Sequence, residues 1–104
     1  MPVGETPSLI TNERAKLRHA LMNEEVGEYL EGCEKEDLPN VVKEIVDVLY
    51  SAFGTVVEHG LQDVIEEAFK EVHRSNMSKD YNELKMTKGE NYRPADINSI
   101  LAKR

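Results

Sequence analysis

Acidic side chains recur at helical spacing in two places of this 104-residue sequence. In the stretch NEEVGEYLEG, Glu28 follows Glu24 by four positions and Glu25 by three. In VVKEIVDVLY, Glu44 and Asp47 are also three apart. Residues three or four apart share one face of a helix. Two such pairs facing each other would form a cage of carboxylate oxygens, the ligand set that Mg²⁺ binds together with waters and substrate phosphates.

The surroundings of the acidic pairs favour a functional role. The first group continues the apolar stripe of Leu17 and Leu21, and the second pair lies in the narrow polar strip of an otherwise apolar segment. Ionised carboxylates in such places are costly unless they have partners, and few Lys or Arg residues are near in sequence. The alternative is a solvated helix face, because Glu is a good helix former. The pattern alone leaves both interpretations open.

Two other kinds of metal site fit the sequence poorly. A ferritin-like di-iron site needs two Glu-x-x-His pairs. None of the three histidines, His19, His59 and His73, lies three positions after a Glu. The nearest case is His73, which lies two positions after Glu71. The single Cys33 excludes an intramolecular disulfide and a cysteine-based zinc site, and it suits a reducing compartment.

The acidic pairs fall on two predicted helices. Residues 1–11 contain two prolines and no periodicity, so they predict an extended lead-in. Apolar periodicity predicts a helix over residues 12–32 and a second one over 38–59. Asp37 is the expected N-cap of the second helix, and Gly60 is the expected glycine after its end. Fifteen residues separate the two acidic pairs, enough for an antiparallel hairpin that brings them to the same level.

The rest of the chain predicts a third main helix and a tail. Apolar positions indicate a helix over residues 62–75, and a short terminal helix over 95–102 within the polar tail 77–104. The second helix is apolar around most of its circumference, so we expect it to be the central, mostly buried one. The sequence thus predicts an all-α fold in a single domain, residues 1–104, made of a helical hairpin, a third helix and a short C-terminal helix.

Composition and charge limit the partners. Only 39% of the residues are hydrophobic and 6% aromatic, so the core is thin and self-association is expected. The net charge is −7, and residues 23–71 hold 14 of the 20 acidic side chains, which disfavours binding to nucleic acid. Residues 72–104 are basic and could face an anion. No segment predicts membrane insertion and no secretory signal precedes the helices, so we expect a cytoplasmic protein.

Four strings of the sequence carry a family resemblance. The strings EEVGE, EIVD, EVHRSNMSKD and KGENYRPADINSIL resemble the MazG-like branch of the all-α nucleoside triphosphate pyrophosphohydrolases. That superfamily also contains dimeric dUTPases and phosphoribosyl-ATP pyrophosphohydrolase. Its hallmark is E-x-x-E followed after a gap by E-x-x-D, which Glu25, Glu28, Glu44 and Asp47 satisfy. The resemblance extends from about residue 7 to residue 101.

The resemblance implies Mg²⁺-dependent hydrolysis of a nucleoside or deoxynucleoside triphosphate to the monophosphate and pyrophosphate, as in nucleotide-pool sanitation, with Mn²⁺ as a substitute ion. The four hallmark acids would be the metal ligands. Catalytic roles are implied for Glu24 and Glu25, with Glu24 positioning or deprotonating the attacking water. The resemblance further implies a four-helix-bundle-like core completed by a partner subunit, as a homodimer or a dimer of dimers.

The resemblance also assigns residues near and in the tail. Asn76 and Lys79 match positions that contact phosphate oxygens, and Arg74 could join them. Tyr92 and Arg93 lie in a segment that could cover the nucleoside. Two other functions stay open. One is hydrolysis of phosphoribosyl-ATP at the same metal site, and the other is a non-catalytic helical dimer that binds nucleotides or regulates a partner. The complete acidic set argues against the second.

Overall fold

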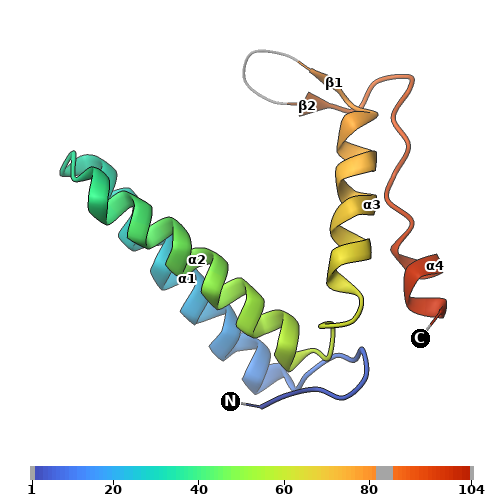
Figure 1. The fold of residues 1–104 in the computed structure, drawn as a ribbon, viewed down its shortest axis with the longest axis horizontal. Helices are drawn as coiled ribbons and strands as arrows, with labels where there is room; N and C mark the ends of the chain where they lie inside the picture. The colour runs from blue at the N-terminus through green and yellow to red at the C-terminus, as the bar shows by residue number, and fades with distance from the viewer. Residues whose placement is uncertain (1, 82–85, 104) are drawn as a thin grey trace. The chain divides into compact units, whose positions relative to one another are not determined.

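The structure is a computed structural model that describes residues 2–81 and 86–103. The fold is all-α, as predicted, apart from two strands of two residues each (Figure 1). Contacts divide the chain into two compact units, Met1–Leu61 and Gln62–Arg104. In chain order the elements are α1 (Asn12–Glu34), α2 (Leu38–Glu58), α3 (Ile65–Met77), β1 (Asp80–Tyr81), β2 (Met86–Thr87) and α4 (Ile97–Ala102). None of the described helices is long and apolar enough to cross a membrane.

Helices α1 and α2 form the predicted hairpin of the first unit (Figure 1). The Oγ1 atom of Thr11 caps α1 by accepting a hydrogen bond from the backbone N–H of Arg14, at 3.2 Å. In the connecting turn Glu36 has a φ of +54°, which is a left-handed backbone conformation. Asp37 then caps α2 by accepting from the N–H of Asn40 at 3.3 Å, so the prediction of this N-cap is confirmed.

The other end of the hairpin is bound to the N-terminal segment. Gly60 has a φ of +71°, which confirms it as the glycine that ends α2. The N–H of Gly4 donates to the carbonyl of Val57 at 2.9 Å, and the N–H of Ser8 donates to the carbonyl of His59 at 3.0 Å. The described part of the lead-in contains no helix or strand and bends at residues 5–7, and these hydrogen bonds hold it against the end of α2.

The prediction that the second helix is mostly buried is wrong for the single chain. A hairpin of two helices has only one inner face, so it cannot cover a helix that is apolar all round. The exposed apolar residues of α2 include Val42, Ile45, Val46, Leu49, Tyr50 and Phe53. The described side chains that are buried in the hairpin are instead polar: Arg18, Glu44 and Glu58.

The second unit contains α3, the two short strands and α4. Helix α3 begins at Ile65 rather than at the predicted residue 62, because residues 62–64 form a turn and no side chain caps the helix. Helix α4 begins at Ile97, after Asp96 accepts hydrogen bonds from the N–H and Oγ of Ser99. The strands pair antiparallel, with Asp80 opposite Thr87. The tail is therefore partly ordered by local hydrogen bonds.

Candidate active site

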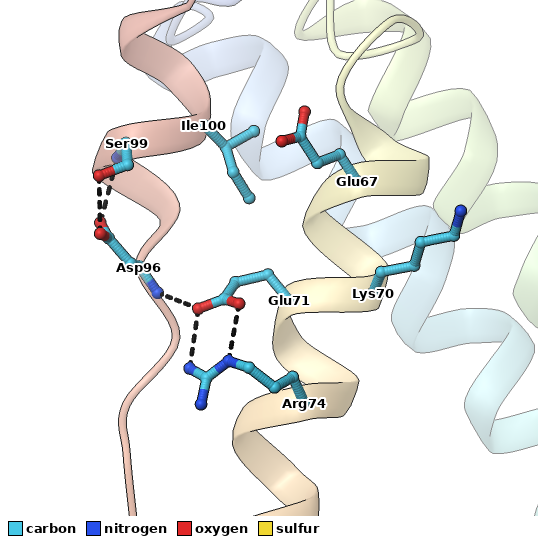
Figure 2. A pocket seen from close by; sticks show the side chains of 7 residues that line it. All are labelled: Glu67, Lys70, Glu71, Arg74, Asp96, Ser99 and Ile100. Carbon is cyan, nitrogen blue, oxygen red and sulfur yellow. Dashed lines mark hydrogen bonds and ion pairs between the residues drawn. The ribbon is translucent and has the colours of Figure 1, made fainter.

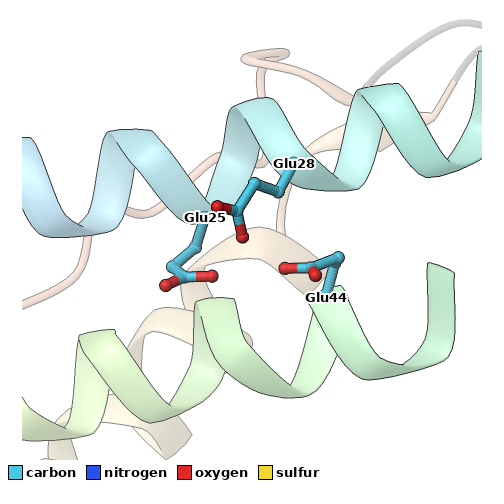
Figure 3. Close-up of side chains that lie close together, drawn as sticks. All are labelled: Glu25, Glu28 and Glu44. Atoms are coloured by element: carbon cyan, nitrogen blue, oxygen red, sulfur yellow. The ribbon is translucent and has the colours of Figure 1, made fainter. Parts of the chain in front are cut away.

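Three carboxylates meet between the two helices of the hairpin (Figure 3). Glu25 and Glu28 project from α1 and Glu44 projects from α2, and one carboxylate oxygen of each lies within 4.8 Å of the others. The i, i+3 spacing places the first two on one face, and the antiparallel turn brings α2 back against that face. The structure thus brings together three of the four predicted metal ligands.

Two oxygens of this cluster are buried without a partner. Glu44 is 5% exposed, whereas Glu25 and Glu28 are half-buried. Of the described residues, none forms a hydrogen bond with the Oε2 atom of Glu25 or with that of Glu44. Buried polar atoms are almost always satisfied in folded proteins. Such atoms in a carboxylate cluster call for either a proton or a cation.

The pKa values of Glu25 and Glu28 reflect the crowding of carboxyl groups in the cluster. The pKa of Glu28 is raised from 4.5 to about 7, first because it shares a hydrogen bond with Glu44, then because of burial and neighbouring negative charge. Burial raises the pKa of Glu25, and the charge of Asp47 adds to the effect. Raised carboxyl pKa values are expected when acids crowd together in a partly dry site. Glu28 therefore keeps its proton to a higher pH than an isolated glutamate does.

Asp47, the fourth predicted ligand, lies beside the cluster. Its Oδ2 atom accepts a hydrogen bond from the Nζ of Lys43 at 2.8 Å, and the same ammonium lies 3.4 Å from the Oε1 of Glu44. Lys43 is one of the few bases that the sequence places near these acids, and it contacts both of them. A lysine one position before Glu44 and four before Asp47 can reach both.

The three clustered carboxylates fit a Mg²⁺ ion. The donors are oxygens only, they come from two rigid helices, and two of their buried oxygens have no partner among the described residues. Mg²⁺ prefers oxygen ligands in octahedral geometry and keeps several waters, so three or four carboxylates suffice. Glu25, Glu28 and Glu44 would hold the ion, and Asp47 could join them by releasing Lys43.

Glu24, the predicted proton acceptor, is exposed on α1 directly before Glu25. It is not one of the three clustered residues. Its position next to the cluster leaves its carboxylate in contact with solvent, to which an accepted proton could pass.

An apolar groove adjoins the cluster on the hairpin. It has a volume of about 670 Å³, and both Glu25 and Asp47 line it. Its other lining residues are Arg18, Leu21, Tyr50, Ser51, Phe53, Gly54 and Val57. A mainly apolar wall with two aromatic rings and a few polar groups is typical of a site for a flat organic ring. Sequence reasoning did not identify this groove.

A buried ion pair at the far end of the hairpin was also missed. Glu58 accepts hydrogen bonds from Nε and Nη2 of Arg14 at 2.7 and 2.8 Å. The Nε of Arg18 lies 3.9 Å from the Oε1 of Glu58. The hydrogen bond from Arg14 lowers the pKa of Glu58. In an antiparallel hairpin, facing residues have position numbers with a constant sum. The pair Glu28 and Glu44 has the same sum as Arg14 and Glu58, so the register was a signal that could have predicted this contact.

The predicted residues around α3 make their contacts within the second unit. Asn76 and Lys79 are half-buried, and the Lys79 Nζ lies 5.9 Å from the centre of the Tyr92 ring. The Nη1 of Arg93 donates to the carbonyls of Glu90 and Tyr92, at 3.3 and 3.0 Å. That Asn76 and Lys79 contact the phosphates of a substrate stays a prediction.

Arg74, a candidate for phosphate binding, is already engaged (Figure 2). Its Nε and Nη2 atoms donate to the two carboxylate oxygens of Glu71, each at 2.8 Å, and Nη2 also donates to the carbonyl of Pro94 at 3.0 Å. Glu71 in turn accepts a hydrogen bond from the N–H of Asp96 at 2.7 Å, and its pKa is lowered to about 2, first by Arg74. These contacts give Arg74 a structural role in holding the tail to α3.

The sequence also matches a protein family. The family model described as phosphoribosyl-ATP pyrophosphohydrolase matches residues 1–76, which include the acidic cluster and Asn76 but not the tail. A comparison with curated proteins gives no match.

Proposed function

This chain belongs to the phosphoribosyl-ATP pyrophosphohydrolase family, and we propose from that premise that it catalyses Mg²⁺-dependent hydrolysis of a nucleoside or deoxynucleoside triphosphate. The family places the reaction at a phosphoric anhydride bond. In the proposed reaction this is the bond between the α- and β-phosphates, and the products are the nucleoside monophosphate and pyrophosphate. Removal of unwanted nucleotides from the cellular pool is the proposed role.

The observation that carries the proposal is the cluster of Glu25, Glu28 and Glu44, with two buried oxygens that no described residue satisfies. A bound Mg²⁺ would neutralise phosphate oxygens and lower the pKa of water, which is the chemistry that anhydride hydrolysis needs. The raised pKa values of Glu25 and Glu28 support an ion here, because a cation would stabilise their ionised forms.

The residues around the cluster receive distinct roles. Glu25, Glu28 and Glu44 hold the ion, and Asp47 completes the set when Lys43 moves away. The oxygen of a water molecule bonds to one of the two phosphorus atoms of the α–β anhydride while the bond from that phosphorus to the bridging oxygen breaks, and the other phosphate group leaves with the bridging oxygen. Glu24, beside Glu25, accepts the proton that the water loses and passes it to solvent.

The adjoining groove supports a nucleotide as the substrate. Glu25 and Asp47 line one part of it, and Leu21, Tyr50 and Phe53 supply apolar walls for a base. Asn76 and Lys79 are proposed to contact the phosphate oxygens, as the resemblance of the SNMSK string implies.

Phosphoribosyl-ATP is the second candidate substrate, and the description of the matching family favours it. It has the same triphosphate end and the same scissile bond, so the metal site serves either molecule. The two differ at the base, which in phosphoribosyl-ATP carries a second ribose with its own phosphate. Selection between them would depend on the groove and on the residues that cover it.

We also propose that a second copy of the chain covers the exposed apolar residues of α2 outside the groove, as a homodimer or a dimer of dimers. These residues include Val42, Ile45, Val46 and Leu49. Exposed contiguous apolar surface of this kind marks an interface in most proteins. A non-catalytic helical dimer would have the same surface, so only turnover distinguishes it from the enzyme.

A substrate panel tests the proposal. The full-length chain is incubated with each common and modified triphosphate and with phosphoribosyl-ATP, with Mg²⁺ or with EDTA, and products are identified by ³¹P NMR. We expect pyrophosphate and a monophosphate from at least one substrate in Mg²⁺ only. Glu44→Gln should lower the rate by about 100-fold or more, because it removes a ligand from the ion.

The matched control is Glu31→Gln, which removes the charge of an exposed glutamate on the same helix as Glu25. It should leave the rate within about twofold of the original. Release of orthophosphate alone, or full activity in Glu44→Gln, would contradict the proposed mechanism.

A further inference from the structure

Two lysines of the second unit lie near one aromatic ring. The Nζ of Lys79 is 5.9 Å from the centre of the Tyr92 ring, and the Nζ of Lys88 is 5.4 Å from it. An ammonium group within about 6 Å of a ring centre is attracted by the negative face of the ring. Tyr92 and Lys79 are half-buried and Lys88 is exposed. Sequence reasoning named Lys79 and Tyr92 but not Lys88.

Neither of these two lysines has an acidic partner among the described residues, whereas three other bases of the same unit do. The described ion pairs of this unit are Lys70 with Glu66, Arg74 with Glu71 and Lys103 with Glu67. The ring attracts each ammonium group but does not neutralise its charge. An anion with charge on two neighbouring groups would pair with the ammonium groups near this ring.

The backbone around the ring is fixed by hydrogen bonds. The N–H of Tyr92 donates to the carbonyl of Gly89 at 3.1 Å, which closes a turn after Lys88. The next N–H, of Arg93, donates to the Oγ of Ser78 at 2.7 Å. Because Ser78 is adjacent to Lys79, this bond holds the ring beside that lysine.

A second set of contacts holds the segment that follows the ring. Glu71 accepts a hydrogen bond from the N–H of Asp96 and is bonded to Arg74 (Figure 2). Arg74 also donates to the carbonyl of Pro94. Charged groups with several hydrogen bonds of 2.7 to 3.0 Å form strong, geometrically specific contacts. The backbone that carries the ring is therefore fixed before any ligand binds, which reduces the entropy that binding costs.

We propose that Lys79, Lys88 and Tyr92 form a binding site for a diphosphate group, and that Lys88 is a further substrate-binding residue. The inference rests on the proposed function in naming this group as the β- and γ-phosphates of the substrate, which leave as pyrophosphate. Lysine ammonium groups act as point charges on phosphate oxygens. The Tyr92 ring then serves to place the two ammonium groups rather than to stack on the base, which revises the nucleoside role suggested by the sequence.

Binding of inorganic pyrophosphate to the full-length chain, measured by isothermal titration calorimetry in EDTA, tests the site without turnover. Lys88→Met keeps an apolar stem and removes the charge, and Tyr92→Leu removes the ring. We expect each to weaken pyrophosphate binding by about tenfold. Lys88→Arg and Tyr92→Phe, which keep the charge and the ring, should bind within about twofold of the original chain.

The matched control is Lys16→Met, which removes an exposed lysine from α1 in the other unit. It should leave the affinity for pyrophosphate unchanged. A non-hydrolysable triphosphate analogue should depend on Lys88 as pyrophosphate does, whereas a nucleoside monophosphate should not. Circular dichroism of each variant shows that it is folded.

The inference is overturned if the original chain does not bind pyrophosphate, if Lys88→Met binds it with unchanged affinity, or if Lys16→Met weakens binding equally. Its failure is distinguishable from failure of the proposed function. A chain that binds pyrophosphate through Lys88 but hydrolyses no member of the substrate panel supports the site and contradicts the enzyme. An active enzyme in which Lys88→Met changes neither KM nor pyrophosphate affinity supports the proposed function and contradicts the diphosphate site.

Discussion

Glutamates at the two ends of the hairpin differ in their ionisation because they face different partners. Glu28 faces Glu44, and its pKa is raised to about 7. Glu58 accepts hydrogen bonds from Arg14, and its pKa is lowered. All these side chains lie between the same two helices, so the partner on the opposite helix decides whether the pKa of the glutamate is raised or lowered. One end of the hairpin is stabilised by its charges, whereas carboxyl groups crowd together at the other end.

These opposite shifts predict a stability maximum at about pH 5 in the metal-free chain. Between pH 4.5 and about 7 the folded chain keeps a proton on Glu28 that the unfolded chain has lost, so the free energy of unfolding falls as pH rises. Below pH 4.5 Glu58 and Glu71 stay ionised only in the folded chain, so stability is lost as pH falls. Urea unfolding in EDTA, followed by circular dichroism between pH 3 and 8, measures both slopes.

Glu28→Gln is the control for the upper slope, because it removes the group that titrates near neutral pH. The decline between pH 5 and 8 should become shallower in this variant, and the loss of stability in acid should persist. A metal-free chain that becomes steadily more stable from pH 5 to pH 8 would contradict the assignment.

At the scale of the elements, local signals in the sequence predicted the hairpin well. Asp37 lies at the start of α2 and Gly60 follows its end, as expected, because capping depends on the residue type at one position. The register could be predicted too, because the loop length brings Glu28 opposite Glu44. The salt bridge of Lys43 with Asp47 depends on a side-chain rotamer, which sequence spacing does not determine.

Element boundaries without a strong cap were predicted less well. Helix α3 starts three residues later than its apolar pattern suggests, because Val64 provides no side-chain cap. Helix α4 starts after Asp96, a capping residue that the predicted range of 95–102 had placed inside the helix. Apolar periodicity locates a helix, but the hydrogen bonds at its ends decide where it begins.

Gly60→Ala is predicted to destabilise the first unit by more than about 1 kcal/mol. The φ of +71° is unfavourable for alanine, and a Cβ atom there would overlap the backbone of Thr6. The matched control is Gly27→Ala in the middle of α1, where a Cβ meets nothing within 4 Å. This change should stabilise the helix by about 0.5 to 1 kcal/mol. Urea unfolding measures both, and equal stability of the two variants would contradict the account.

At the scale of the whole molecule, composition predicted the thin core correctly. Only Val64 and Ile100 are buried among the described apolar residues, whereas Val42, Val46 and Phe53 remain exposed on α2. The sequence predicted a buried second helix because it showed how apolar that helix is, but it could not show what covers it. Whether the acidic cluster and the lysines of the tail act together likewise depends on packing between distant segments, which no local pattern encodes.

The exposed stripe of α2 predicts self-association. We expect light scattering after size exclusion to give a mass of at least two chains. Val46→Lys should shift the mass toward one chain, because Val46 is 55% exposed within the apolar stripe and a charge there would be costly to bury. Leu9→Lys is the control, since Leu9 is 93% exposed and lies in the N-terminal segment. A single-chain mass for the original protein would contradict the proposal of a dimer.

Titration with Mn²⁺, followed by electron paramagnetic resonance of the free ion, tests most directly whether the hairpin holds a divalent cation. We predict that the original chain and Glu31→Gln bind the ion with similar affinity, and that Glu44→Gln binds it at least about tenfold more weakly. If Glu44→Gln binds Mn²⁺ as tightly as the original chain does, the three carboxylates are not the metal site.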